Sequence, residues 1–198
     1  MTTVLVSAGS YRQDGMIDQA VNAAAAMARR AGARVEVVQL RDVPIAFCQN
    51  CRECTQRPGE APGDCVQDDR MRELVGLIET ADAYILASPT NFYTVTALFK
   101  RFMERLVIYA YWPWGEPAPV ARRSRMTRKA LLIASSAAPA LLARLFFSTM
   151  KQLRLTARTL GARPAGEVYL GQAASARRSR LAAADKSRIE RLAARLVA

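Results

Sequence analysis

Residues 83–97 read Ala-Tyr-Ile-Leu-Ala-Ser-Pro-Thr-Asn-Phe-Tyr-Thr-Val-Thr-Ala, an apolar run followed by small and polar residues. The run Ala83–Ala87 is short and bounded by turn residues, which is typical of a buried strand. A helix is predicted to follow from about Thr94 to Tyr109. A buried strand, a loop and a helix in succession form the repeating unit of a parallel sheet. This stretch therefore predicts an α/β fold with a functional loop at residues 88–93.

The same unit recurs along the chain. Further strands are predicted at Thr3–Ser7, Arg34–Leu40, Lys129–Ala134 and Val168–Leu170. Further helices are predicted at Gly15–Ala31, from Asp68 and Asp69 to about Thr80, at Pro139–Leu160, and in a C-terminal segment with Leu181, Ile189, Leu192 and Leu196. The alternation predicts one domain over residues 1–198, with a five-stranded parallel sheet and helices on both faces. Ligands of such sheets bind beyond the carboxyl ends of the strands, so the loops after the first, third and fourth strands are the expected site.

Two connections are longer than is usual. The stretch at about 42–66 is irregular and contains all four cysteines and three prolines. The stretch at about 111–128 is rich in Trp and Arg, and it contains Trp112 and Trp114. Connections of this length are commonly functional or disordered. The tryptophans are expected either to pack on their own domain or to lie over a ligand or at a subunit interface.

The composition limits the chemistry that the side chains can perform. The 198 residues include no histidine, which excludes a Ser-His-Asp triad, a Cys-His pair and a His-ligated metal. Catalysis must then come from other side chains or from a cofactor. We therefore assign no catalytic acid or base.

The formal net charge of +12 lies entirely in the second half of the chain. Residues 1–99 hold 9 Lys/Arg and 12 Asp/Glu, whereas residues 100–198 hold 20 and 5. The basic clusters are Arg122, Arg123, Arg125, Arg128 and Lys129, and then Arg177, Arg178 and Arg180. No helix-turn-helix or aromatic RNA-binding signature accompanies them. We expect a solvated face, or a surface for a partner, a subunit or an NADPH phosphate, and no nucleic acid.

The N-terminus gives no targeting signal. Met1 and two threonines lead directly into the first apolar run, without a positive leader or a cleavage pattern. The apolar stretches are too short or too charged to span a bilayer, so no membrane association is expected. A cytoplasmic protein follows, in which the cysteines are thiols or metal ligands rather than stable disulfides.

The loop after the third predicted strand carries a recognisable pattern. Its members are Ser88, Pro89, Phe92, Val95, Thr96 and Ala97, followed by Lys100, Phe102, Glu104 and Arg105. This pattern resembles the NADPH-dependent FMN reductase family, and the resemblance extends over about residues 3–171. It implies a flavodoxin-like three-layer fold with strand order 2-1-3-4-5.

The resemblance also implies a site for FMN. The turn with Ser10 and Arg12 resembles the phosphate loop of the family, although small polar residues are also ordinary in such turns. The loop after the third strand would line the isoalloxazine with Ser88, Pro89, Thr90, Asn91, Phe92 and Tyr93, and Ser135 and Ser136 would close a third side. The chain departs from the family at Met16 and Ile17, which are apolar where the family has phosphate-binding hydroxyls.

The cysteines follow the pattern Cys48-x2-Cys51-x2-Cys54-x10-Cys65. Two tight spacings suit thiolates that converge on one [4Fe-4S] cluster. The pattern resembles the cysteine-containing branch of the family, which includes iron–sulfur flavoproteins with a shorter last gap. Free or vestigial thiols, a zinc site and a redox disulfide remain open alternatives.

The leading hypothesis is an FMN-dependent NAD(P)H oxidoreductase. A hydride would pass from nicotinamide to flavin, and the electrons would go on to a quinone, a flavin or another small-molecule or protein acceptor. The alternative is an electron-transfer iron–sulfur flavoprotein that serves an acidic protein partner. A third is a basic regulatory or nucleic-acid-binding protein on the same scaffold. The resemblance further implies a homodimer or homotetramer.

Overall fold

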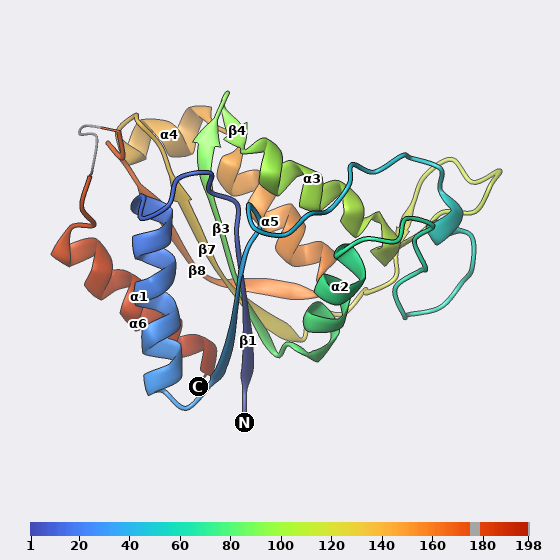
Figure 1. Ribbon diagram of the computed structural model, residues 1–198, viewed down its shortest axis with the longest axis horizontal. Coiled ribbons are helices and arrows are strands. Elements are labelled where there is room, and N and C mark those ends of the chain that lie inside the picture. The colour runs from blue at the N-terminus through green and yellow to red at the C-terminus, as the bar shows by residue number, and fades with distance from the viewer. Residues whose placement is uncertain (175–178, 198) are drawn as a thin grey trace.

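Five parallel strands form the centre of the protein in the computed structural model, which describes residues 1–174 and 179–197. The strands are β1 (Thr3–Ala8), β2 (Arg34–Gln39), β3 (Ala83–Asn91), β7 (Arg128–Ser135) and β8 (Ala162–Leu170). They pair in the order β2-β1-β3-β7-β8, which confirms the predicted sheet and its order (Figure 1). The switch point of the sheet lies between β1 and β3: the chain places β2 on one side of β1, and β3, β7 and β8 on the other. At this point Val4 of β1 pairs with Ala83 of β3. A ligand crevice is expected beyond the carboxyl ends of these two strands.

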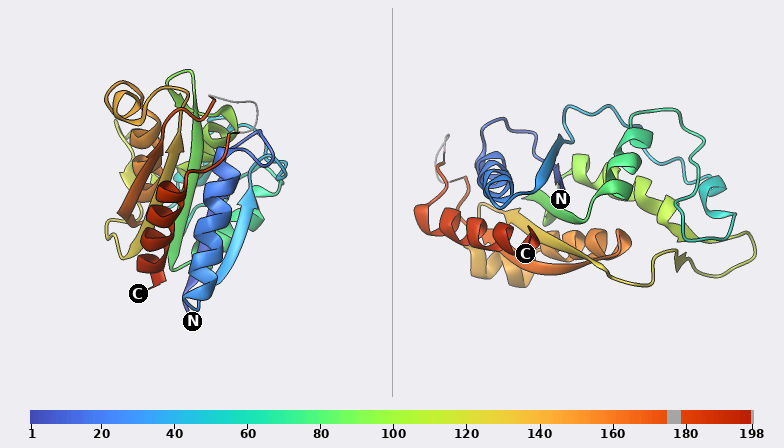
Figure 2. Two further views of the ribbon diagram at one scale, coloured as in Figure 1. Left: turned by 90° about the vertical axis from the view of Figure 1, so that its left-hand side faces the viewer. Right: turned by 90° about the horizontal axis from the view of Figure 1, so that it is seen from below.

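Helices cover both faces of the sheet (Figure 2). One face carries α1 (Met16–Arg30) and α6 (Ala183–Val197), and the other carries α2 (Met71–Thr80), α3 (Ala97–Arg105), α4 (Ala140–Phe146) and α5 (Thr149–Thr159). Side chains alternate along a strand, so Val4 and Val6 pack under α1 and α6 while Leu5 packs under α2 and α3. Within the described residues, no helix is both long enough and apolar enough to cross a bilayer.

Two of the predicted helices are shorter than expected. The helix predicted from Thr94 begins at Ala97, because Thr96 is its N-cap and accepts a hydrogen bond from the N–H of Phe99. Thr94–Val95 instead form β4, which pairs antiparallel with the end of β3. A 3-10 turn, η2 (Leu106–Tyr109), completes the predicted span.

The long helix predicted at 139–160 is interrupted and forms α4 and α5. Phe147 adopts an extended backbone (φ −106°, ψ 142°) between them. The N–H of Ser148 donates to the carbonyl of Tyr93 at 2.7 Å. A tertiary hydrogen bond to the β3–β4 hairpin therefore occupies this backbone group, a contact that helical periodicity does not reveal.

The two long connections pack on each other at one end of the molecule. The first contains the 3-10 turn η1 (Glu53–Thr55), and the second contains a small hairpin of β5 (Ala110–Tyr111) and β6 (Val120–Ala121). The N–H of Trp112 donates to the Thr55 carbonyl at 2.9 Å, and the guanidinium of Arg52 lies 3.7 Å from the Trp112 ring centre. The tryptophans thus cover the cysteine-bearing loop.

Candidate functional site

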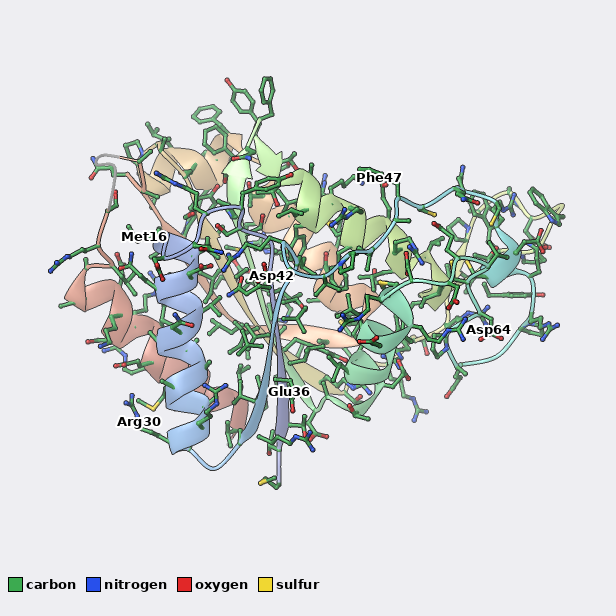
Figure 3. All side chains as sticks on the ribbon, viewed as in Figure 1. Met16, Arg30, Glu36, Asp42, Phe47 and Asp64 are labelled. Atoms are coloured by element: carbon green, nitrogen blue, oxygen red, sulfur yellow. The ribbon has the colours of Figure 1, made fainter. Side chains whose placement is uncertain are left out.

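A cavity of about 430 Å³ opens where β1, β3 and β7 end. Its walls come from the loops after these strands, from the start of α1 and from the segment after β8. Figure 3 shows Met16, one of the lining residues, at the end of α1 that faces this edge of the sheet. The volume lies in the range of roughly 300–1,000 Å³ that is usual for small-molecule and cofactor sites.

Most of the predicted flavin-site residues lie in this cavity. Those that line it are Ser10, Arg12, Pro89, Thr90, Asn91, Ser135 and Ser136. Ser88 lies beneath it: the side chain is fully buried, donates to the Pro89 carbonyl at 2.9 Å and accepts from the N–H of Thr96 at 3.2 Å. Ser88 therefore shapes the loop from below rather than lining the cavity.

Phe92 and Tyr93 form the tip of the β3–β4 hairpin, outside the cavity lining. Both have positive φ (46° and 64°), a conformation that costs energy in bulky residues and is often found at functional sites. Phe92 is 98% exposed and Tyr93 is 66% exposed. The Tyr93 ring meets Phe147 edge-on at a centroid distance of 5.1 Å, which helps to hold the tip against α5.

The end of the cavity at α1 has the features of an anion site. The N-cap of α1 is Gly15, and no side chain caps the first turn, so its N–H groups remain available to a ligand. The Ser10 hydroxyl is engaged in the turn, because it accepts from the N–H of Arg12 and contacts the Arg12 carbonyl, both at 3.2 Å. Backbone N–H groups and the Arg12 guanidinium are therefore the hydrogen-bond donors at this end of the cavity, where the side chains of Met16 and Ile17 offer none.

Arg41 clamps this turn from the end of β2, and the sequence did not single it out. One guanidinium nitrogen donates to the Ser10 carbonyl at 3.2 Å and to the Asp18 carboxylate at 3.1 Å. The second lies 3.0 Å from the other oxygen of the 4%-exposed Asp18. This cation offsets the carboxylate beside the expected phosphate position. No local spacing links residues 18 and 41, so only the fold reveals the pair.

Met16 and Ile17, which the sequence singled out as departures from the family, also line the cavity. The lining residues that the sequence did not predict are Tyr11, Gly15, Ala137, Ala173 and Ala174. The segment after β8 enters because the N–H of Ala173 donates to the Ser136 carbonyl at 2.8 Å. This segment follows β8 at the same edge of the sheet as the other loops, and that position was the only feature of the sequence that could have indicated its place in the cavity wall.

The four cysteines are free thiols in the loop at 42–66 and occupy different environments. Cys54 is buried, Cys51 is exposed, and Cys48 and Cys65 are intermediate. Burial, followed by electrostatic interaction with Cys65, Cys48 and Cys51, raises the pKa of the Cys54 thiol to about 11. The four side chains thus lie near enough to interact electrostatically. Within the described residues, however, no three Cys, Asp or Glu side chains gather closely enough to hold a single metal ion.

The long gap before Cys65 closes on itself. The N–H of Gly63 donates to the Ile108 carbonyl at 2.9 Å. A Cβ atom at position 63 would lie only 1.8 Å from the Cys54 carbonyl oxygen, so the chain crosses itself here only because residue 63 is glycine. The insertion therefore returns Cys65 toward Cys54.

Arg105 links the cysteine loop to the rest of the fold. Its side chain is 1% exposed and makes hydrogen bonds of 2.6 and 3.1 Å to the Asp69 carboxylate. It also donates to the Ala46 carbonyl at 3.0 Å and to the Cys65 sulfur at 3.4 Å. Burial alone would raise the pKa of Asp69, but hydrogen bonds from Arg105 and from the N–H groups of Ala46 and Met71 outweigh it and lower that pKa.

The basic cluster before β7 is largely engaged in structural contacts. Arg123 pairs with Glu79, and Arg128 donates to the Tyr84 hydroxyl at 2.6 Å and to the Glu79 carbonyl at 3.0 Å. Arg125 is exposed. This cluster lies at the start of β7, at the opposite edge of the sheet from the cavity. Arg177 and Arg178 of the second cluster lie outside the described residues.

A parallel sheet of order 2-1-3-4-5 with a cavity at its switch point defines a flavodoxin-like protein. Within that class the chain belongs to the NADPH-dependent FMN reductase family, whose model matches residues 2–175. The resemblance found in the loop after the third predicted strand is thereby confirmed.

Curated relatives share part of the chain. An iron-sulfur flavoprotein of Archaeoglobus fulgidus is 38% identical over 105 residues, which is 53% of this chain and 46% of the relative. A second protein of that name and organism is 30% identical over 77 residues, 39% of this chain and 35% of the relative. The matched region thus spans less than half the length of either relative.

Solved structures share the fold at low identity. An FMN-dependent NADH-azoreductase from Bacillus anthracis, determined in complex with FMN, has a TM-score of 0.72 at 12% identity. The match covers 100% of this chain and 100% of the azoreductase. A flavodoxin from an archaeon has a TM-score of 0.57 at 10% identity, over 100% of this chain and 96% of the other. Both confirm the flavodoxin-like fold.

Proposed function

We propose that this protein binds FMN in the cavity at the ends of β1, β3 and β7 and oxidises NAD(P)H. The observation that supports this most directly is the convergence of three predicted loops on one cavity. The family supports FMN and a nicotinamide cosubstrate. When bound, the flavin would accept a hydride from nicotinamide and pass electrons to a quinone, a flavin or another acceptor.

The residues present fit this cofactor. The first turn of α1 and Arg12 would hold the phosphate, and Arg41 would keep the turn in shape and balance the charge of Asp18. Pro89, Thr90 and Asn91 would present the β3 loop to the ring. The Thr90 hydroxyl is already bonded to Thr149 at 2.7 Å and to Tyr169 at 2.6 Å, so the cavity wall is rigid there.

Protein purified without oxygen and supplied with FMN should show a protein-bound flavin spectrum. That flavin should bleach on addition of NADH or NADPH, and the comparison of the two gives the nucleotide preference. A preparation that stays colourless after incubation with FMN would refute the proposal. Bound flavin that no nicotinamide reduces would refute its catalytic part and favour the electron-transfer alternative.

A tryptophan at position 137 should fill the cavity and abolish FMN binding. Ala137 is exposed and lines the cavity from the loop after β7, so Ala137→Trp adds a large ring to the site without entering the core. We expect the Kd for FMN to rise at least tenfold, measured by quenching of flavin fluorescence. Ala26→Trp, at an exposed position on α1, is the matched control and should bind FMN like the wild type. Equal affinity in the two variants would place the flavin elsewhere.

A second candidate function is that of an iron–sulfur flavoprotein in electron transfer. The donor set supports it: four thiols lie in one loop, and the insertion closes so that Cys65 returns toward Cys54. The name of the relative from A. fulgidus agrees with it. Cys48, Cys51, Cys54 and Cys65 would hold a [4Fe-4S] cluster, which supplies one-electron transfer when present. Reduction by an acidic protein donor, at a rate that falls steeply with salt, would distinguish this function from NAD(P)H oxidation.

We also propose that the protein is a homo-oligomer that associates through the hairpin–α4 face, defined by Phe92, Tyr93, Leu141, Leu145 and Phe146. All five side chains are more than 60% exposed and lie beside the cavity, an unusual concentration of apolar surface. Light scattering should give the mass of a dimer or tetramer. Leu145→Arg should shift the protein toward monomer, whereas Leu155→Arg on α5 should not. A monomeric wild type at micromolar concentration would contradict the proposal.

A further inference from the structure

Three hydroxyl groups meet in the wall of the cavity at the ends of β1, β3 and β7. The Thr90 hydroxyl lies 2.7 Å from the Thr149 hydroxyl and 2.6 Å from the Tyr169 hydroxyl. These residues come from the end of β3, the first turn of α5 and β8. Thr149 and Tyr169 are 0% and 4% exposed, whereas Thr90 is half-buried and lines the cavity. We call the three residues the hydroxyl triad.

The hydroxyl triad holds one more proton than its internal hydrogen bonds use. Each hydroxyl has one proton to donate and two lone pairs, and two hydrogen bonds join the three groups. Within the described residues, the Thr149 and Tyr169 hydroxyls have no other hydrogen-bond partner. An unmatched proton on either of these buried groups would cost free energy. Both groups therefore donate to the Thr90 oxygen, and the unused proton is that of Thr90.

The unused proton makes Thr90 a donor toward the cavity. Its two lone pairs are occupied by Thr149 and Tyr169, so the Thr90 hydroxyl cannot readily accept a further hydrogen bond. In the part of the chain that the structure describes, no protein group accepts its proton, and Thr90 lines the cavity. Donation from two neighbours also polarises this hydroxyl and strengthens the bond that it donates. This wall therefore suits a ligand that presents an acceptor atom.

Ser135 adds a second unmatched hydroxyl to the same wall. It pairs with Pro89 across β3 and β7, directly beside Thr90 in the chain. Ser135 is 3% exposed and lines the cavity, and its hydroxyl has no hydrogen-bond partner within the described residues. Buried hydroxyls are nearly always hydrogen-bonded. Two neighbouring hydroxyls of this kind indicate that a polar edge of the ligand lies here, rather than an apolar surface.

We propose that Thr90 donates a hydrogen bond to an acceptor atom of the flavin ring, and that Thr149 and Tyr169 are positioning residues that keep Thr90 a donor. The inference rests on the FMN binding proposed above. The isoalloxazine offers acceptors in its carbonyl oxygens and its unprotonated nitrogens. The phosphate is expected at the first turn of α1, which is a different wall of the cavity. Riboflavin, which has the ring but no phosphate, should therefore depend on Thr90 as FMN does.

The test begins with Thr90→Val, which keeps the shape of the side chain and removes its hydroxyl. We expect the Kd for FMN to rise about tenfold, because a ring acceptor loses its donor in a site where it is largely removed from water. The Kd for riboflavin should rise by the same factor, and quenching of flavin fluorescence measures both. Thr90→Ser keeps the hydroxyl and should restore most of the affinity. Thr127→Val, at an exposed position at the opposite edge of the sheet, is the matched control and should bind FMN like the wild type.

A variant without the whole triad separates the hydrogen bond to the ligand from support of the wall. In Thr90→Val alone, the Thr149 and Tyr169 hydroxyls lose their acceptor, and the wall can shift for that reason. The variant Thr90→Val/Thr149→Val/Tyr169→Phe leaves no buried donor unmatched, so its stability in urea should stay closer to that of the wild type than that of Thr90→Val. Its Kd for FMN should nevertheless stay raised about tenfold. Wild-type affinity in this variant would show that the triad only supports the wall, and would overturn the proposal. This variant also decides if Thr90→Val does not fold.

The failures of the two proposals are distinguishable. A wild type that binds no FMN overturns the proposed function and the hydrogen bond from Thr90 together. A wild type that binds FMN, with the same affinity in Thr90→Val, overturns the role of Thr90 alone. A loss of affinity for FMN that leaves riboflavin unaffected would place Thr90 at the phosphate, and would overturn the contact with the ring.

Discussion

Arg105→Met is expected to lower the free energy of unfolding by about 3–5 kcal/mol at neutral pH, because it leaves the largely enclosed carboxylate of Asp69 without its cation. The wild-type pair is enclosed: the Arg105 side chain is 1% exposed and that of Asp69 is 14% exposed. Removing one member of such a pair costs more than replacing both, since the remaining carboxylate loses its charge partner but stays out of water. Urea unfolding followed by circular dichroism measures the change.

A matched control is available on α2. Arg72 forms an ion pair with Asp68 across one helical turn, and their side chains are 75% and 93% exposed. Arg72→Met is the same substitution and removes the same charge, but water and salt screen the Arg72–Asp68 ion pair. Its free energy of unfolding should stay close to that of the wild type. Equal destabilisation in both variants would show that the Arg105–Asp69 pair has no special structural role.

The same pair predicts how stability depends on pH. The pKa of Asp69 is lowered in the folded state, so its contribution to stability is fully present above the unfolded value of about 3.9 and is lost as pH falls through the folded value. In Arg105→Met, protonation instead relieves the unpaired carboxylate. The difference between the unfolding free energies of wild type and variant should therefore shrink as the pH is lowered below about 4. A difference that is constant from pH 7 to pH 3 would contradict this assignment.

The sequence revealed the parts of the fold that local patterns encode. The apolar runs of β1, β3 and β7 identify buried strands, and parallel strands bring their following loops to one edge, so the cavity could be located before any coordinates. The ion pair of Arg41 with Asp18 could not be predicted from the sequence, because it joins residues from two different βα units. The same is true of Ser148, whose bond to the β3–β4 hairpin interrupts an otherwise helical pattern.

The cysteine loop shows a second kind of limit. Its spacing predicted thiols that could converge, but not whether the long insertion would return Cys65. That outcome depends on Gly63. This residue is not one of the glycines with positive φ, and no pattern in the sequence distinguishes it from the other glycines. Contacts between the two long connections, such as Arg52 with Trp112, are likewise decided by tertiary packing.

Gly63→Ala is expected to open the cysteine loop. The added Cβ would stand 1.8 Å from the Cys54 carbonyl oxygen and 2.8 Å from its carbon. Both are backbone atoms, so no side-chain rotation can relieve the clash, and the loop must move away from Cys54 and Arg122. The stability cost of such overpacking is about 1–3 kcal/mol. The larger effect should be on the cysteines, because Cys65 loses its position.

Thiol labelling measures this effect without requiring a bound cluster. In the wild type, Cys54 is 7% exposed and its pKa is about 11, so its thiolate fraction and its accessibility are both low. In Gly63→Ala we expect Cys54 to react at least tenfold faster with a thiol reagent, followed residue by residue with mass spectrometry. Gly76→Ala is the control: nothing lies within 4 Å of its Cβ position on α2, and replacing a helical glycine should stabilise the protein slightly. Unchanged labelling of Cys54 in Gly63→Ala would mean that the crossing at residue 63 does not hold the loop closed, and the return of Cys65 would need another cause.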